Sequence, residues 1–104
     1  PGHPQADLIQ SQMGGPGSLI AFELKGGFEA GKKVLSAVHI PALAVSLGGV
    51  ESLIQHPASM THAAMAHADR LAADITDGLV RLSVGCESPE DLRADLKQAL
   101  DSLV

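Results

Sequence analysis

The sequence predicts one small α/β domain of the α+β type, a largely antiparallel sheet of three to four strands with helices packed on one face. Its 104 residues are long enough for a single core and too short for two. Short apolar runs at residues 18–24 and 79–84 alternate with a period of two, which is typical of strands. Residues 28–38 and 89–103 carry apolar side chains at helical spacing instead, which indicates helices that cover the sheet.

The first third of the chain is predicted to supply a linker, a strand and a helix. Residues 1–17 are rich in proline and glycine, so we expect a linker with one short helix over residues 6–13. Residues 18–24 follow as a strand buried mainly on one face. Its alternating apolar residues are Ile20, Phe22 and Leu24. Residues 28–38 are expected to form an amphipathic helix that ends before Pro41. Its apolar stripe is Phe28, Val34, Leu35 and Val38.

The middle of the chain is predicted to add two strands and a second helix. Residues 42–47 are predicted to form a strand that ends at the glycine pair 48–49, and residues 52–55 to form a third, short strand. Residues 56–62 show no usable period and should form a loop. The alanine-rich residues 63–74 have high helix propensity but a weak apolar stripe, so we expect a shallowly packed helix there.

The last two elements have the clearest patterns. Residues 79–84 alternate as a strand. One face carries Leu79, Arg81 and Ser83, and the other carries Val80, Leu82 and Val84. The final helix begins with Ser88 as its N-cap and Pro89 at its first helical position. Its apolar stripe is Leu92, Leu96, Leu100 and Leu103.

Charge and composition argue against several classes of partner. The chain has 12 acidic and 7 basic residues and a formal net charge of -5, which disfavours a nucleic acid or an anionic membrane surface as partner. No apolar run approaches the roughly 20 residues of a membrane span, and no signal peptide is recognisable. The single cysteine, Cys86, fits a reducing compartment. We therefore expect a cytoplasmic protein with neither nucleic acid nor membrane among its partners.

Three motifs that could hold a ligand are weak. His56, His62 and His67 are six and five residues apart, so they lack the i, i+4 spacing of two ligands on one helix face, and no metal site is expected. Residues 13–18 contain the glycines of a phosphate loop but not its Lys-Ser/Thr ending, which favours a turn. Cys86 has no histidine near it in sequence, so it is interpreted as structural or incidental and not as a nucleophile.

Arg81 is the residue with the strongest claim to a function. It stands in the middle of a predicted strand, where a guanidinium needs either an internal carboxylate or a bound anion, because an unpaired buried charge is costly. Spacing alone leaves both possibilities open and favours the internal salt bridge.

Four segments together resemble a known enzyme family. They are IAFELKGG at 20–27, AVSLGGVESL at 44–53, HPASMTH at 56–62 and GLVRLSVG at 78–85. In this order and spacing they are similar to the C-terminal domain of the cysteine/methionine-metabolism family of pyridoxal-phosphate (PLP) enzymes. Within it the chain most resembles the methionine gamma-lyase branch, because relatives that process cystathionine tend to carry Glu where Val45 stands.

The resemblance implies roles for five residues. Arg81 matches the arginine that grips the α-carboxylate of the substrate, and Ser46 matches the residue beside it that helps to hold the same group. Val45, Leu47 and Met60 match positions near the substrate side chain, where apolar groups suit a thioether. No catalytic and no cofactor-binding residue is expected in this chain.

The resemblance also implies a function for the larger protein. Residues 18–104 are expected to be the C-terminal domain of a PLP-dependent carbon–sulfur lyase that converts L-methionine to methanethiol, ammonia and 2-oxobutanoate. PLP is expected in the full-length enzyme, a homo-oligomer and in the family a tetramer. The isolated chain should be inactive without cofactor, and should form a dimer or a swapped form. The alternatives are a cystathionine gamma-lyase or gamma-synthase domain and a non-catalytic, self-associating remnant.

Overall fold

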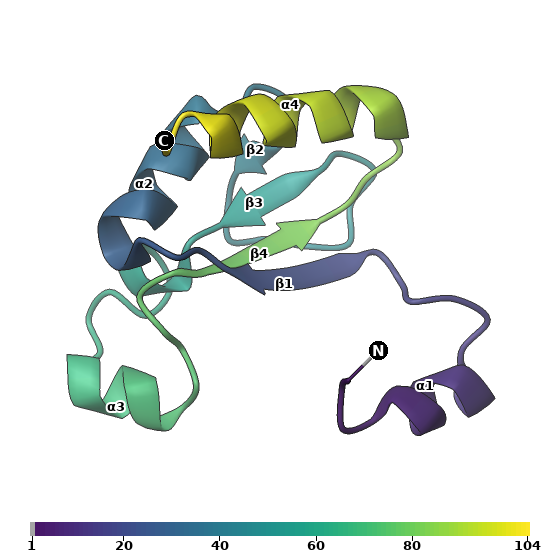
Figure 1. Cartoon of the computed structure of the whole chain (residues 1–104), viewed down its shortest axis with the longest axis horizontal. Coiled ribbons are helices and arrows are strands. Elements are labelled where there is room, and N and C mark those ends of the chain that lie inside the picture. The colour runs from purple at the N-terminus through teal and green to yellow at the C-terminus, as the bar shows by residue number, and fades with distance from the viewer. Residues whose placement is uncertain (1) are drawn as a thin grey trace.

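The computed structural model describes residues 2–104 and contains one four-stranded sheet with two helices laid across it (Figure 1). Its elements in chain order are α1 (Ala6–Gln12), β1 (Leu19–Glu23), α2 (Gly27–Ala37), β2 (Ala42–Leu43), β3 (Leu53–Gln55), a 3₁₀ turn η1 (Pro57–Ser59), α3 (His67–Ala72), β4 (Leu79–Ser83) and α4 (Pro89–Asp101). No helix among the described residues is long and apolar enough to cross a membrane.

The sheet is mixed but largely antiparallel, as expected. Its strand order is β1-β4-β3-β2. Strand β4 pairs antiparallel with β1 on one side and with β3 on the other, whereas β2 pairs parallel with β3 at the far edge. The last predicted strand, β4, is therefore an inner strand of the sheet, as is β3.

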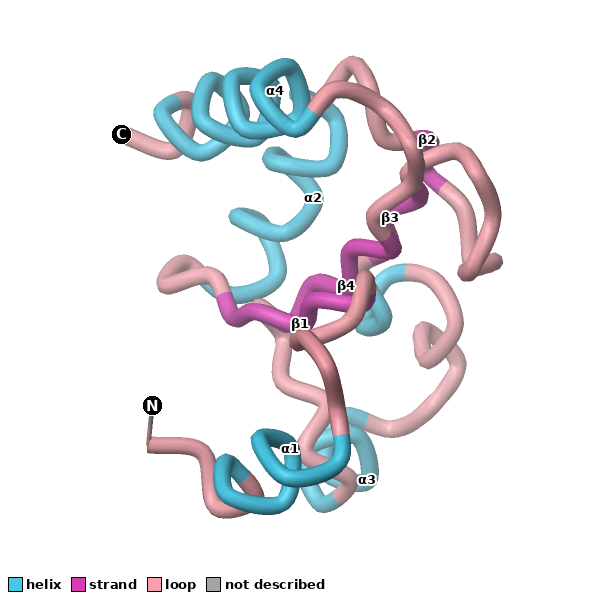
Figure 2. Tube along the Cα trace, turned by 90° about the vertical axis from the view of Figure 1, so that its right-hand side faces the viewer, coloured by secondary structure: helices cyan, strands magenta, loops and turns pink. Residues whose placement is uncertain are grey.

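The core lies between the sheet and helices α2 and α4, which cover the same face (Figure 2). Val80 and Leu82 of β4 are buried there, together with Ile54 of β3, against Val34 of α2 and Ala99 of α4. The predicted alternation along β4 is thus confirmed. Arg81 and its alternate neighbours occupy the opposite face, which α2 and α4 leave uncovered.

Two predicted burial patterns are wrong in part. Ile20 is 48% exposed, because β1 is an edge strand and only its far end, near Leu24, reaches the core. On α4 the stripe is rotated: Leu100 is exposed, whereas Asp95 and Ala99 are buried. The rotation brings the Asp95 carboxylate to the backbone N–H groups at the end of α2, an interaction that a count of leucines does not reveal.

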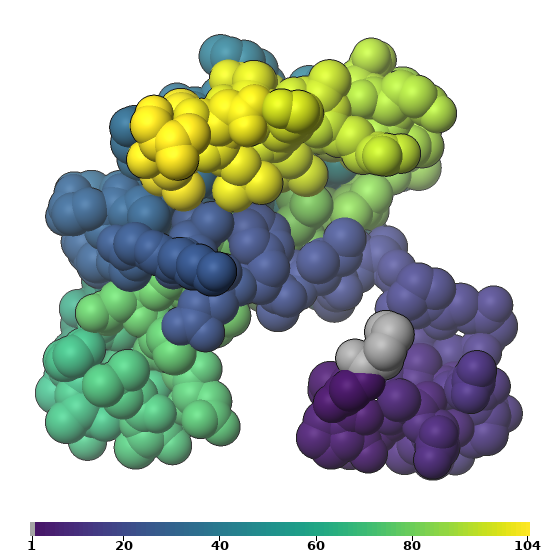
Figure 3. Space-filling view, viewed as in Figure 1, coloured from purple at the N-terminus to yellow at the C-terminus, as the bar shows by residue number. Residues whose placement is uncertain are grey.

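Several predicted boundaries are also wrong. The expected strand at 42–47 ends at Leu43, because the carbonyl oxygens of Val45 and Ser46 accept from a side chain and not from a neighbouring strand. The expected helix at 63–74 is reduced to α3, since the first residues form turns. A 3₁₀ turn interrupts the predicted loop. Helix α1 buries none of its residues and lies apart from the sheet, at lower right in Figure 3.

Candidate substrate-carboxylate site

Arg81 projects from the uncovered face of the sheet and is held by backbone carbonyl groups. Its Nη2 donates to the carbonyl oxygen of Val45 at 2.8 Å and to that of Ser46 at 3.1 Å. No carboxylate among residues 2–104 forms an ion pair with it. The internal salt bridge that spacing favoured is therefore not found in the described part of the chain, and the positive charge of Arg81 is left without a counter-ion.

The loop that contains Val45 and Ser46 is fastened to β4 at a second point. We call residues 44–52 the carboxylate loop. The N–H of Gly48 donates to Ser83 Oγ at 2.9 Å, and Gly48 has a φ of +78°, which glycine adopts without strain. Ser83 is two residues after Arg81 and shares its face of β4. One strand therefore holds the loop through two side chains.

The far end of the carboxylate loop is fixed by a buried serine. Ser52 is fully buried, and its N–H and hydroxyl each donate to one oxygen of the Glu87 carboxylate at 2.7 Å. Its Oγ accepts from the N–H of Gly85 at 2.9 Å. The hydrogen bonds from Ser52 hold the pKa of Glu87 below its ordinary value. A Cβ at Gly85 would overlap the carbonyl oxygen of Val50, so the close approach requires glycine there.

The structure brings four of the five predicted site residues to one place. Val45 and Leu47 are 54% and 49% exposed on the carboxylate loop, and Ser46 between them offers its carbonyl oxygen to Arg81. Met60 lies elsewhere: it is half-buried against the core, and its sulfur accepts from the N–H of His56 at 3.4 Å. A role for Met60 near the substrate side chain stays a prediction.

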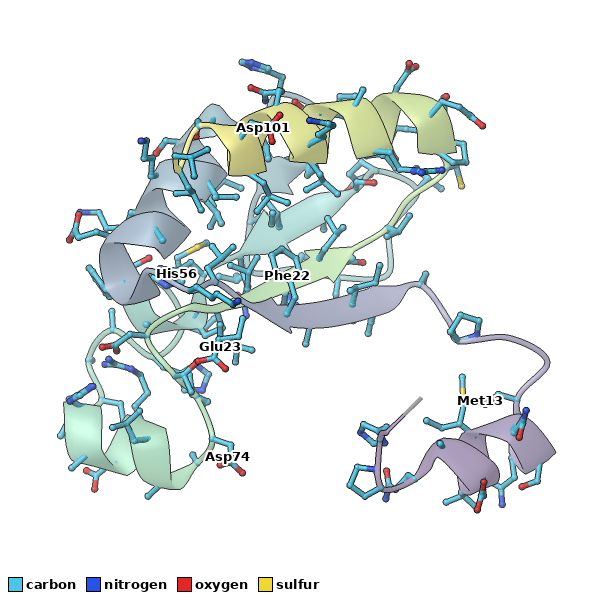
Figure 4. The ribbon with its side chains drawn as sticks, viewed as in Figure 1. Met13, Phe22, Glu23, His56, Asp74 and Asp101 are labelled. Atoms are coloured by element: carbon cyan, nitrogen blue, oxygen red, sulfur yellow. The ribbon has the colours of Figure 1, made fainter. Side chains whose placement is uncertain are left out.

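Two of the three histidines, His56 and His67, contact Asp77, which precedes β4. His56 is fully buried beside α2 (Figure 4), and its Nε2 donates to the carbonyl oxygen of Asp77 at 2.7 Å. His67 contacts the Asp77 carboxylate at 3.2 Å. The buried Arg70 hydrogen-bonds the same carboxylate and is the main reason why the pKa of Asp77 lies below its ordinary value. Within residues 2–104 no group of three candidate ligands could hold a metal ion.

Four residues that matter here were not singled out from the sequence. Arg70 pairs with Asp77 in the turn before β4. Ser83 and Glu87 hold the carboxylate loop, and Gln55 is the register partner of Arg81. The alternation along the strand placed Ser83 on the same face as Arg81, but it gave no sign of the contact with Gly48. Gln55, Glu87 and Arg70 act through contacts with distant segments, and local patterns contain no trace of those contacts.

The described residues do not fit PLP. The four lysines (Lys25, Lys32, Lys33 and Lys97) are exposed; of these, Lys32 lies over the ring of Phe28 and Lys97 pairs with Asp101. Neither phenylalanine ring is free to stack on a cofactor. Phe22 packs against the core, and the ring centroid of Phe28 lies 5.4 Å from that of His56. No lysine and aromatic ring converge here on a site for the cofactor.

Comparison with known proteins identifies the family to which the chain is similar. The family model described as "Cys/Met metabolism PLP-dependent enzyme" matches residues 1–101. The chain is 59% identical to L-methionine gamma-lyase of Porphyromonas gingivalis over 104 residues, and 52% identical to cystathionine beta-lyase of Coxiella burnetii over 100 residues. A crystal structure of a cystathionine gamma-lyase from Micromonospora echinospora superposes with a TM-score of 0.88 at 40% identity, over 97% of this chain.

The matches cover nearly all of this chain but only a small part of each relative. Each match covers nearly all of this chain, and 100% of it in the first case, but only 26% of each of these three relatives. The chain therefore spans about a quarter of the length of the relatives it matches. The matched quarter is their C-terminal part.

Proposed function

Because the chain belongs to the Cys/Met metabolism family of PLP-dependent enzymes, we propose that it is the substrate-carboxylate-binding part of a lyase that cleaves the carbon–sulfur bond of L-methionine. In this proposal residues 18–104 form the C-terminal domain of the enzyme, and residues 1–17 are the segment that enters it. The products are methanethiol, ammonia and 2-oxobutanoate.

The observation that carries the proposal is the state of Arg81. Its guanidinium is oriented by two backbone carbonyl oxygens and meets no carboxylate among residues 2–104. With Nη2 held by the two carbonyl oxygens, the N–H groups of Nη1 and Nε stay available to donate charge-assisted hydrogen bonds to a carboxylate. Arg81 is therefore suited to bind the α-carboxylate of an amino acid and to fix its orientation during the reaction.

The neighbours of Arg81 favour a substrate with an apolar, sulfur-containing side chain. Val45 and Leu47 are exposed and flank Ser46 on the carboxylate loop. A thioether is weakly hydrated and polarisable, so it is accommodated by such apolar groups better than by a charged one. Six relatives that share between 50% and 59% identity with the chain are L-methionine gamma-lyases, which supports methionine over cystathionine as the substrate.

The cofactor, in this proposal, is bound outside residues 2–104. PLP supplies the electron sink of such reactions when it is bound, whereas this chain positions the substrate. We further propose that the enzyme is a homo-oligomer, since exposed apolar side chains such as Leu19 and Leu43 are suited to contacts with other protein surfaces. An exposed free cysteine, Cys86, supports a reducing compartment such as the cytoplasm.

The test is the kinetics of Arg81→Lys in the full-length enzyme of which we propose this chain to be a part. Loss of one charge-assisted hydrogen bond should lower kcat/KM for L-methionine by about 10- to 100-fold. The matched control is Arg93→Lys, at an exposed position of α4, which should leave kcat/KM unchanged. A decrease of less than about threefold for Arg81→Lys would exclude the carboxylate role, and faster turnover of L-cystathionine than of L-methionine would exclude the proposed substrate.

A further inference from the structure

Gln55 lies directly beside Arg81 in the sheet. The two residues are register partners in the antiparallel pair of β3 and β4. Side chains at opposed positions of such a pair project from the same face, with Cβ atoms about 4.5–5.5 Å apart. Because Arg81 projects from the uncovered face, Gln55 lies beneath the same site.

Both side chains contain a buried polar atom without a hydrogen-bond partner in the described part of the chain. In Gln55, which is only 4% exposed, this atom is the acceptor Oε1. In Arg81 it is the donor Nε–H. Buried polar atoms in proteins almost always have a partner, so an unpaired acceptor beside an unpaired donor points to a contact that forms when the site is occupied.

We propose that Gln55 is a positioning residue for Arg81. When a carboxylate binds, Oε1 of Gln55 accepts the Nε–H of Arg81, while Nη2 keeps its bonds to the carbonyl oxygens of Val45 and Ser46. Three contacts then fix the plane of the guanidinium and leave the two N–H groups of Nη1 for the substrate. This inference rests on the proposed role of Arg81 and adds the residue that determines its orientation.

A bond from Gln55 should strengthen the recognition of a carboxylate and leave the rest of the substrate unaffected. The Nε–H hydrogen bond restrains rotation of the guanidinium about its last torsions, so a planar anion meets two N–H groups already in place. A neutral amide in the position of the carboxylate gains much less, because charge-assisted hydrogen bonds are roughly twice as strong as neutral ones. This difference separates a positioning role from a purely structural one.

The experiment compares two inhibitors in the full-length enzyme. L-norleucine has the shape of methionine without sulfur, and L-norleucinamide differs from it only by replacement of the carboxylate with an amide. In Gln55→Leu the inhibition constant of L-norleucine should rise about tenfold, whereas that of L-norleucinamide stays within about twofold.

The controls distinguish the possible failures. If Gln55→Leu raises the inhibition constants of both inhibitors equally, or of neither, Gln55 does not position Arg81. If Arg81→Lys leaves the L-norleucine constant unchanged, the proposed carboxylate site itself fails, whatever Gln55 does. Gln10→Leu on the exposed helix α1 is the matched surface substitution and should change neither constant. Should Gln55→Leu not fold, Gln55→Met keeps the volume without the amide and is judged by the same inhibitor pair.

Discussion

Gly31 provides a quantitative test of the packing beneath the site. It lies within α2, where alanine would ordinarily raise helix stability by about 1 kcal/mol. A Cβ at this position, however, would lie 2.6 Å from Cδ2 and 2.8 Å from Cε1 of the His56 ring, and closer still to Nε2. These separations are too short for carbon atoms in contact, so either the ring or the helix must move.

The cost of displacing His56 exceeds the gain in helix propensity. The ring is fully buried and makes hydrogen bonds to the carbonyl oxygen of Asp77 at 2.7 Å and to Ser59 Oγ at 2.8 Å. Each partner left unsatisfied in a buried position costs about 1–3 kcal/mol. The higher helix propensity of alanine offsets about 1 kcal/mol of this cost. We therefore expect Gly31→Ala to lower the free energy of unfolding by about 3 kcal/mol.

The assay is urea unfolding of the 104-residue chain, in a double-mutant cycle with His56→Ala. In the His56→Ala background the overlap is gone, so Gly31→Ala should be neutral or stabilising by up to about 1 kcal/mol. Ser36→Ala on the exposed side of α2 is the control for helix propensity. An equal loss from Gly31→Ala in both backgrounds, or no loss in the parent, would refute the reasoning about the ring.

Two further predictions concern the carboxylate loop and the N-terminal segment. Since Ser52 lowers the pKa of Glu87 in the folded state, this carboxylate stabilises the fold above its ordinary pKa of about 4.3, and the contribution is lost as the pH falls through the lowered value. The stability difference between the parent and Glu87→Gln should therefore shrink from pH 6 to pH 3 in urea unfolding, and a constant difference would contradict this. Deletion of residues 1–17 should change the free energy of unfolding by less than about 0.5 kcal/mol, because α1 buries no residue; a loss of several kcal/mol would show that the segment packs on the fold.

Local sequence patterns predicted the elements whose causes are local. Alternation alone placed Val80 and Arg81 on opposite faces of the strand, because the period of a strand is fixed by its backbone, and the structure buries Val80. The start of α4 was predicted equally well: Ser88 caps it by accepting the N–H of Asp91, and Pro89 follows at the first position. These features depend on residues only a few positions apart.

Long-range contacts determined what the patterns could not predict. The leucine stripe suggested that Leu100 is buried, but α4 is turned so that Asp95 accepts the N–H groups of His39 and Ile40. Burial opposes ionisation of Asp95, yet these hydrogen bonds outweigh it and hold its pKa below the ordinary value. The bonding partners are 55 and 56 residues apart in sequence, so no local period could contain the information.

Residues for the candidate site could be proposed from the sequence, but their contacts could not. The position of Arg81 in a strand showed that the guanidinium needs a partner, and resemblance to the family supplied Ser46 and the apolar residues beside it. That the partners are the carbonyl oxygens of Val45 and Ser46, 36 and 35 residues away, follows only from how the carboxylate loop folds over β4. Gln55 lies beside Arg81 because of the register between β3 and β4, and local sequence patterns do not specify that register.

The most direct test of the carboxylate site is a crystal structure of the full-length enzyme with L-norleucine bound. We predict that a carboxylate oxygen lies about 2.7–2.9 Å from Nη1 of Arg81, with Val45 or Leu47 against the aliphatic side chain. A carboxylate bound by another cation, with Arg81 turned away from it and still held only by the loop carbonyl groups, would contradict the central claim.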